Sequence, residues 1–289
     1  MVGAAGKSIN VAKVLKALSA SPLATGFLGN DRGEFIVRVL ASKKIAADFV
    51  TVSAPTRQCV TIIDESTRAN RVTELVEESR PVTARDYERL LVIVRRQVGK
   101  CRAVVMSGSL TPGGPVDFYR RCTELAHEAG ALSILDAQGP ALAEALKAGP
   151  GVIKPNRAEL AATVGQELKD ERSVLEAMRE LCLRGARHVV VTGGTRPAIA
   201  FDGHSAWRIH SAPIAAVNPI GSGDAFTAGL VLGLLRGEDL GHACCLAAAA
   251  GAANALTLMP GELRRADVSR LTSAVKLERT GTPRLSGVA

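Results

Sequence analysis

The sequence predicts an α/β fold in which a mostly parallel sheet is covered on both faces by helices. From residue 83 onward, stretches with helical periodicity alternate with short apolar stretches of strand length. Polar or glycine-rich turns follow several of these strands, which is where open α/β sheets bind ligands; they begin at Ser107, Asp136, Asn156, Thr192 and Gly221. The 289 residues, 47% hydrophobic and 22% charged, are typical of a globular protein with a sizeable core.

The first quarter of the chain is less regular. Apolar spacing predicts a helix over 8–18, a strand over 23–28, a helix over 34–41 after a turn, and a strand over 49–52. Two β-rich stretches, 59–64 and 71–76, are joined by polar residues and predict a hairpin. Because the hairpin interrupts the alternation, we expect it outside the main sheet, as a lid within residues 50–77.

The rest of the chain alternates regularly. Helices are predicted over 84–98, 115–129, 140–147, 157–164 and 173–184, and strands over 103–106, 132–135, 152–154 and 188–191. Pro197 cannot donate a ladder hydrogen bond, so the next hairpin is predicted only over 198–201 and 206–209.

The C-terminal part contains two apolar helices and a polar end. Residues 221–235 predict a buried helix, and the Ala-rich stretch 243–259 is too short for a membrane span and predicts a second one. Residues 273–289 are expected to fray. No linker divides the chain, so we expect a single domain over 1–289.

Composition excludes several functions. Aromatic residues make up only 3%, and the net charge of +8 comes from scattered Lys and Arg, so a nucleic-acid surface is not expected. That charge favours a phosphorylated small substrate. The six Cys lack C-x-x-C spacing, which argues against structural zinc and favours free thiols in a reducing compartment. With no visible signal peptide, a cytoplasmic location without membrane contact is expected.

The chemically most informative stretch is Gly221-Ser222-Gly223-Asp224, shortly before the apolar run 227–235. Backbone without Cβ atoms turns sharply, and the N–H groups at a helix N-terminus favour anions. A carboxylate beside an anion site suggests a base that takes a proton from a hydroxyl attacking a phosphate. The alternative is that Asp224 only caps a buried helix; these residues alone do not decide.

Four segments resemble motifs of the ribokinase-like, PfkB-type carbohydrate kinases, most closely the branch of 1-phosphofructokinase and tagatose-6-phosphate kinase. They are residues 5–12 (AGKSINVA), 107–113 (SGSLTPG), 154–160 (KPNRAEL) and 218–224 (NPIGSGD). The resemblance implies a three-layer α/β/α sandwich with a small β lid. It also implies ATP-dependent, Mg²⁺-dependent phosphorylation of a ketohexose monophosphate, and a homodimer formed through the lid.

The resemblance also implies roles for individual residues. Asp224 is the expected base, and the amides of Gly221, Ser222 and Gly223 the expected anion hole. The remaining roles are substrate binding by Lys7, Asn10, Arg57 and Ser109, nucleotide binding by Thr192, Gly194 and Asn254, and water-mediated Mg²⁺ binding by Asn156 and Glu159. Without the resemblance, Asn156-x-x-Glu159 is more typical of a capping box, and Lys7 and Arg57 of solvated surface.

The sequence departs from the family pattern in three places. The family's first sheet strand, part of its lid and a sugar-binding Asp precede the 5–12 segment and are expected to be missing here, through truncation or a misassigned start at Met1. Ala5, Ser8 and Pro197 stand where the family usually has Gly. Two alternatives therefore stay open: a catalytically impaired protein that binds sugar phosphate or nucleotide, and a kinase for an unphosphorylated sugar or nucleoside.

Overall fold

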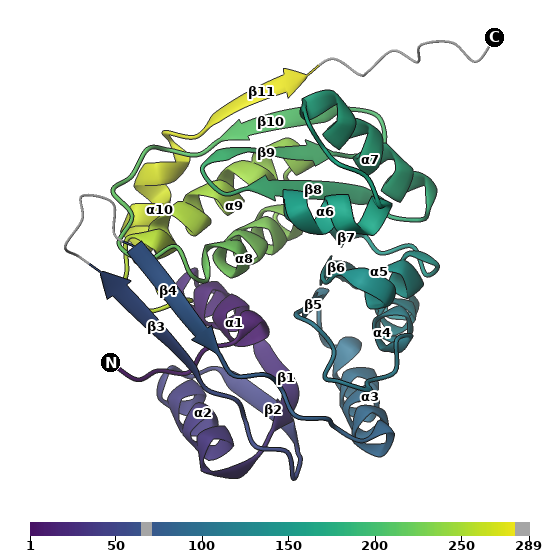
Figure 1. Ribbon diagram of the computed structural model, residues 1–289, viewed down its shortest axis with the longest axis vertical. Helices are drawn as coiled ribbons and strands as arrows, with labels where there is room; N and C mark the ends of the chain where they lie inside the picture. The colour runs from purple at the N-terminus through teal and green to yellow at the C-terminus, as the bar shows by residue number, and fades with distance from the viewer. Residues whose placement is uncertain (65–70, 281–289) are drawn as a thin grey trace.

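The computed structural model describes residues 1–64 and 71–280 (Figure 1). Its main sheet has seven strands in the order β11-β10-β9-β8-β7-β6-β5 within this part of the chain. Neighbouring strands are parallel from β5 to β8 and antiparallel from β8 to β11. The strands are β5 (Ala103–Ser107), β6 (Leu132–Asp136), β7 (Val152–Ile153), β8 (His188–Gly193), β9 (Arg196–Phe201), β10 (Ala206–His210) and β11 (Lys276–Thr280).

Helices cover both faces of this sheet, which confirms the predicted three-layer α/β/α architecture (Figure 1). Successive residues of a strand point to opposite faces of the sheet and so belong to two different hydrophobic cores. On β8, Val189 and Val191 face one set of helices, and Val190 faces the other. The first set comprises α3 (Ala84–Val98), α4 (Phe118–Glu128), α5 (Gly139–Leu146), α6 (Arg157–Val164) and α7 (Glu171–Leu183). The second comprises α1 (Lys7–Ala17), α8 (Ser222–Leu235), α9 (Leu240–Ala255) and α10 (Arg265–Thr272).

Helices α8 and α9 touch backbone to backbone. A Cβ added at Gly229 would lie 2.7 Å from Cα of Ala247, and one added at Gly233 would lie 2.7 Å from Cα of Ala243. Side chains larger than hydrogen at either glycine would force the helices apart. The small residues of the two apolar helices therefore set how closely α8 packs against α9.

Strands β1 (Leu23–Leu28) and β2 (Ala46–Thr51) form a separate parallel pair beside α2 (Asn30–Ser42). Helix α1 contacts both β1 and β5. Among the described residues no strand pairs with the outer edge of either β1 or β5, so backbone groups on both edges have no ladder partner.

The hairpin of β3 (Cys59–Asp64) and β4 (Arg71–Val76) lies outside the main sheet, as predicted. The polar connection 65–70 lies outside the described residues. Val60 and Leu75 pair directly, and Ile62 follows on the same face; all three side chains are about half exposed. An exposed apolar face of this kind is typical of an interaction surface. The homodimer through the lid stays a prediction, which the particle mass in solution would check.

Two predictions for the second half are wrong. Strand β9 does include Pro197, which takes no part in the register with either β8 or β10 because the β8 pairing shifts between Val191 and Gly193. A bulge tolerates the missing N–H without losing a ladder bond. The tail does not fray throughout: β11 pairs with β10, Glu278 forms an ion pair with Arg208 (3.2 Å), and Glu278 Oε2 lies 3.4 Å from His210 Nε2. Residues 281–289 lie outside the described part of the chain.

The Ala-rich helix α9 ends at Ala255, four residues before its predicted end. In the described part of the chain, no helix combines the length and the apolar character needed to cross a membrane.

Candidate active site

The N-terminus of α8 presents unpaired backbone amides. Gly221 precedes the helix in the left-handed conformation (φ 82°), and the N–H of Ser222 donates to Pro219 O at 3.1 Å. The N–H groups of Gly221, Gly223 and Asp224 have no acceptor among the described residues. The free amides thus differ at one position from the set predicted to bind an anion, because the Ser222 amide is used by the turn and the Asp224 amide is free.

Gly221 cannot be replaced without strain. Its φ is one that other residues rarely adopt, and an added Cβ would lie 2.8 Å from Pro260 Cβ and 3.1 Å from Gly261 N. Residues 259–261 therefore pack directly against the turn that opens α8.

The Asp224 carboxylate is buried, with 7% of the residue exposed. Burial raises its pKa to about 6, partly offset by a hydrogen bond that Asn10 Nδ2 donates to Asp224 Oδ2 at 2.7 Å. The negative charge of Asp136 also raises this pKa, and the ammonium groups of Lys7 and Lys154 lower it. Around neutral pH, Asp224 is ionised yet able to accept a proton, which suits a general base.

Asp136, at the end of β6, lies between two lysines. Its Oδ1 is 3.5 Å from Lys7 Nζ and its Oδ2 is 3.4 Å from Lys154 Nζ, and Ser107 Oγ donates to Oδ2 at 3.2 Å. Lys154 is buried, whereas the Lys7 side chain is 44% exposed. An added Cβ at Gly223 would lie 4.0 Å from Lys154 Nζ, so this ammonium adjoins the free amides.

The sequence analysis gave no role to Asp136 or Lys154, although the residues at two successive strand ends signalled them. A parallel sheet brings the carboxyl ends of neighbouring strands to one edge, and an Asp and a Lys placed there are expected to meet.

Loop 107–114 adjoins Lys7 and carries Ser109. Tyr119 OH donates to Gly108 O at 2.8 Å, and Tyr87 OH accepts from Thr111 N at 2.9 Å, so two buried tyrosines hold the loop. Ser109 is exposed, and an added Cβ at Gly108 would lie 4.0 Å from Lys7 Cδ. The structure thus brings the Ser109 loop and Lys7 to the same place, while substrate contact by Ser109 stays a prediction.

Asn156 and Glu159 form the capping box at the start of α6. Asn156 Oδ1 accepts from Glu159 N at 2.9 Å, and Glu159 Oε2 accepts from Asn156 N at 2.8 Å. Thr192 pairs with Asn156 across an isolated bridge. No group of three or more His, Cys, Asp or Glu side chains that could hold a metal occurs within residues 1–64 and 71–280. With Oε2 engaged, Glu159 has Oε1 left, a donor set that fits a hydrated Mg²⁺ better than a directly coordinated ion.

The other predicted binding residues are Asn254, which contacts the turn before α8, and Gly194 and Arg57, which lie on other elements. Asn254 is fully buried; its Nδ2 donates to Ile220 O (2.9 Å) and its Oδ1 accepts from Gly261 N (2.8 Å). Its amide therefore joins two loops, and its contact with a nucleotide stays a prediction. Gly194 (φ 66°) forms the β8–β9 turn, and Arg57 is exposed between β2 and β3, without an ion-pair partner in the described part of the chain.

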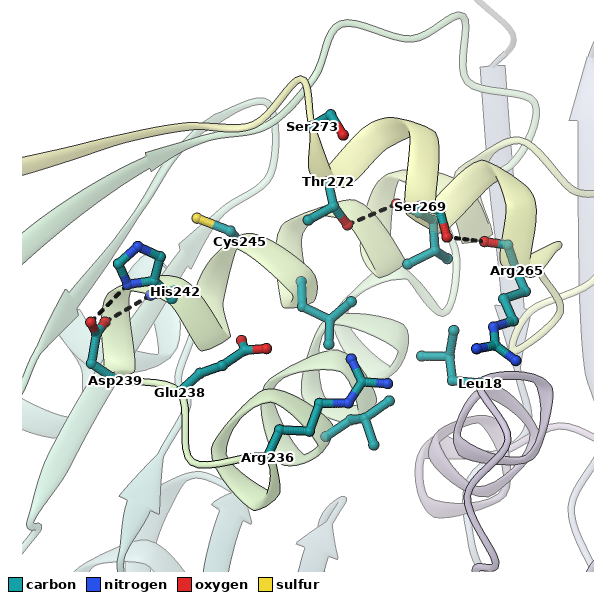
Figure 2. Close-up of a pocket in the computed structure, with 13 residues that line it drawn as sticks. Leu18, Arg236, Glu238, Asp239, His242, Cys245, Arg265, Ser269, Thr272 and Ser273 are labelled. Carbon is teal, nitrogen blue, oxygen red and sulfur yellow. Dashed lines mark hydrogen bonds and ion pairs between the residues drawn. The ribbon is translucent and has the colours of Figure 1, made fainter.

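A cavity of about 680 Å³ lies at the far end of α8, away from this site (Figure 2). Most polar groups in it are engaged within the protein. Asp239 accepts from the backbone and ring of His242, and the Ser269 and Thr272 hydroxyls bond to their own helix. We therefore place the chemistry at the N-terminus of α8.

Free helix-N-terminal amides, one buried and one partly exposed lysine, and a buried carboxylate at the carboxyl edge of a parallel sheet are the features expected of a kinase of small molecules. The model described as pfkB family carbohydrate kinase matches residues 2–261, so the chain belongs to that family. It is a sugar kinase, and its family implies ATP as co-substrate.

Solved structures of kinases are similar to this chain over most of its length, in agreement with the family assignment. Phosphofructokinase-2 from Escherichia coli, in complex with potassium, is 27% identical with a TM-score of 0.84, covering 93% of this chain and 86% of that one. A protein described as a possible 1-phosphofructokinase from Thermotoga maritima is 25% identical with a TM-score of 0.86, covering 95% and 87%. A tetrameric inhibited form of the E. coli enzyme is 27% identical with a TM-score of 0.82, covering 93% and 86%.

Proposed function

We propose that the protein transfers the γ-phosphoryl group of ATP to a hydroxyl of a ketohexose monophosphate. The observation that carries this is the placement of a buried, ionisable Asp224 next to the free amides of Gly221 and Gly223, with Lys7 and Lys154 on either side of Asp136. The ammonium of Lys154 suits the transferred phosphoryl group, and the ammonium of Lys7 suits the phosphate already on the sugar. The similarity to an E. coli phosphofructokinase-2 crystallised with fructose-6-phosphate supports the same substrate class.

In the proposed mechanism, Asp224 accepts the proton of the attacking hydroxyl while Asn10 holds the carboxylate in place. The N–H groups of Gly221, Gly223 and Asp224 donate to the transferred phosphoryl oxygens as charge develops, with Lys154 beside them. Lys7, whose side chain is partly exposed, is free to contact the sugar's own phosphate, and Arg57 joins it from the lid side. Mg²⁺ bound near Glu159 would supply charge compensation for the nucleotide phosphates.

A coupled assay of ADP release over a panel of sugars tests the proposal. The panel contains fructose 1-phosphate, fructose 6-phosphate and tagatose 6-phosphate, with fructose, ribose and adenosine as unphosphorylated acceptors. We expect turnover with at least one of the monophosphates and little turnover with the unphosphorylated acceptors. Turnover only of unphosphorylated acceptors would overturn the substrate class. Ligand-dependent thermal shifts without ADP release would instead identify a binding protein.

The pH dependence follows from the surroundings of Asp224. We expect kcat/KM to fall as the pH drops through about 6, because protonated Asp224 cannot accept the hydroxyl proton. Asn10→Ala should move this acid limb to higher pH, since the Asn10 bond lowers the pKa. Asp136→Asn should move it to lower pH, since the charge of Asp136 raises the pKa. Profiles of kcat/KM against pH for the three proteins check both directions; shifts of the same sign would contradict the assignment of the limb to Asp224.

Arg57 tests recognition of the sugar's phosphate. Arg57→Ala should raise KM for the phosphorylated sugar by about 10-fold or more, as expected for a lost charge-assisted hydrogen bond, with little change in kcat. KM for an unphosphorylated analogue and for ATP should stay unchanged. The exposed Arg172 on α7 provides the matched control, Arg172→Ala. An unchanged KM for every acceptor would remove Arg57 from the binding site.

A further inference from the structure

We propose that Lys13 is a positioning residue of this site, whose buried ammonium ties the segment before α1 to the loop after α9 and so holds that loop against the anion-binding turn. This inference rests on the proposed function. Lys13 lies in the middle of α1 and is only 5% exposed. Its Nζ donates to Ala4 O at 3.0 Å and to Pro260 O at 2.7 Å.

The carbonyls that Lys13 joins belong to segments that border the proposed site. Ala4 precedes Lys7, and Pro260 and Gly261 pack on the other side. An added Cβ at Gly261 would lie 2.7 Å from Asn10 Cα, and one at Gly221 would lie 2.8 Å from Pro260 Cβ. Residues 259–261 are therefore wedged between the residue that orients Asp224 and the turn that opens α8, with no space for either to move independently.

Asn254 provides a second connection between the same loop and the turn before α8. Gly261 N donates to Asn254 Oδ1, and Asn254 Nδ2 donates to Ile220 O, so the loop after α9 and the turn before α8 share one amide. Lys13 supplies the connection on the α1 side, where no other side chain of the described residues bonds to Pro260 O. Without this connection, the loop keeps its bonds to Asn254 and to Asn218, whose Nδ2 donates to Leu258 O at 2.8 Å, but Pro260, which packs on Gly221, loses its side-chain bond to α1.

The surroundings of Lys13 act on its charge in opposite directions. Glu262 Oε1 lies 3.8 Å from Lys13 Nζ and 3.0 Å from the Nζ of Lys43. Burial lowers the pKa of Lys13 to about 8, with Glu262 raising it and Lys43 lowering it. A group that is harder to protonate in the folded protein makes folding less favourable below that pKa, so the fold gains stability as the pH rises from about 8 towards 10.5. The cation is held by its two hydrogen bonds to Ala4 O and Pro260 O, and these bonds carry the positioning role.

The test compares Lys13→Met, Lys13→Ala and the control Lys16→Met, which changes a lysine of the same helix that has no side-chain partner among the described residues. We expect Lys13→Met to lower kcat at least 10-fold with a smaller change in KM for ATP, and Lys16→Met to leave both unchanged. Adding n-propylammonium to Lys13→Ala should recover at least 3-fold of the lost kcat, whereas tetramethylammonium at equal concentration should not.

Amide hydrogen exchange measures the loop itself. The Gly261 amide should exchange at least 10-fold faster in Lys13→Met than in wild type or Lys16→Met, with helix α9 amides unchanged. This readout needs no turnover, so it separates the two proposals: absent turnover in wild type defeats the proposed function, while exchange still tests Lys13. Unchanged Gly261 exchange, or a kcat loss that propylammonium does not reverse and that follows the fraction unfolded at the assay temperature, would overturn the positioning role.

Discussion

Asp224→Asn is expected to lower kcat by about 10³-fold or more while making the folded protein more stable at neutral pH. Activity falls because an amide cannot accept the hydroxyl proton. Stability rises because burial raises the pKa of Asp224 from 3.8 to about 6, so the native state binds more protons than the unfolded state between these values. Unfolding free energy therefore drops as the pH rises through that window, and ionised Asp224 costs on the order of 3 kcal/mol at pH 7.5.

Thermal unfolding at pH 7.5 and near pH 4, combined with kcat at pH 7.5, checks this expectation. The stabilisation should be present at pH 7.5 and largely absent near pH 4, where the carboxyl is protonated and resembles the amide. Asp31→Asn, at an exposed position in α2, is the control and should change neither quantity appreciably. Turnover equal to wild type would remove Asp224 as the base, and a lower melting temperature at pH 7.5 would contradict the burial argument.

Lys154→Met is expected to damage both catalysis and folding. Its ammonium adjoins the free amides, so kcat should fall about 10²-fold or more, as for the loss of one donor to a developing anion. Removing one member of a buried pair leaves Asp136 with the partly exposed Lys7 and the neutral Ser107 hydroxyl as partners, which should lower the unfolding free energy by about 3 kcal/mol.

The double variant Asp136→Asn/Lys154→Met separates these two effects. Replacing both charges removes the unpaired buried carboxylate, so much of the lost stability should return in chemical denaturation, while kcat stays low. If kcat recovers together with stability, Lys154 acts only on the fold. If Lys154→Met alone leaves the denaturation midpoint unchanged, the pair does not stabilise the protein.

The sequence predicted the turn and the helix of the candidate site, because local chemistry leaves few choices there. Gly221 must adopt a positive φ beside Pro260, and the apolar run after Asp224 can only be a buried helix, so the anion-binding turn was recognisable. Which amides stay free was not, because the bond from Ser222 N to Pro219 O depends on the exact turn. The place of Asp136 between two lysines was not predicted either, since it depends on the order of strands in space.

Elements were missed where long-range pairing overrides local preference. Pro197 lies inside a strand because a bulge removes it from the ladder, and polar residues 276–280 form an edge strand because Glu278 meets Arg208 on β10. Asn254 was predicted to contact nucleotide, but its neighbours in sequence say nothing about Ile220 and Gly261, the two partners that its amide joins.

The contact of α8 with α9 through Gly229 and Gly233 has a consequence for how the enzyme can work. Because the main chains of α8 and α9 are in contact, α8 has little room to shift. We therefore expect the amides at its N-terminus to keep their orientation whether or not a ligand is bound. Reorganisation during turnover must then fall on other parts, such as the hairpin and the exposed Lys7 side chain. In the proposed mechanism, Gly229 and Gly233 therefore keep the phosphoryl-binding amides in place through their contact with α9, without contacting the substrate themselves.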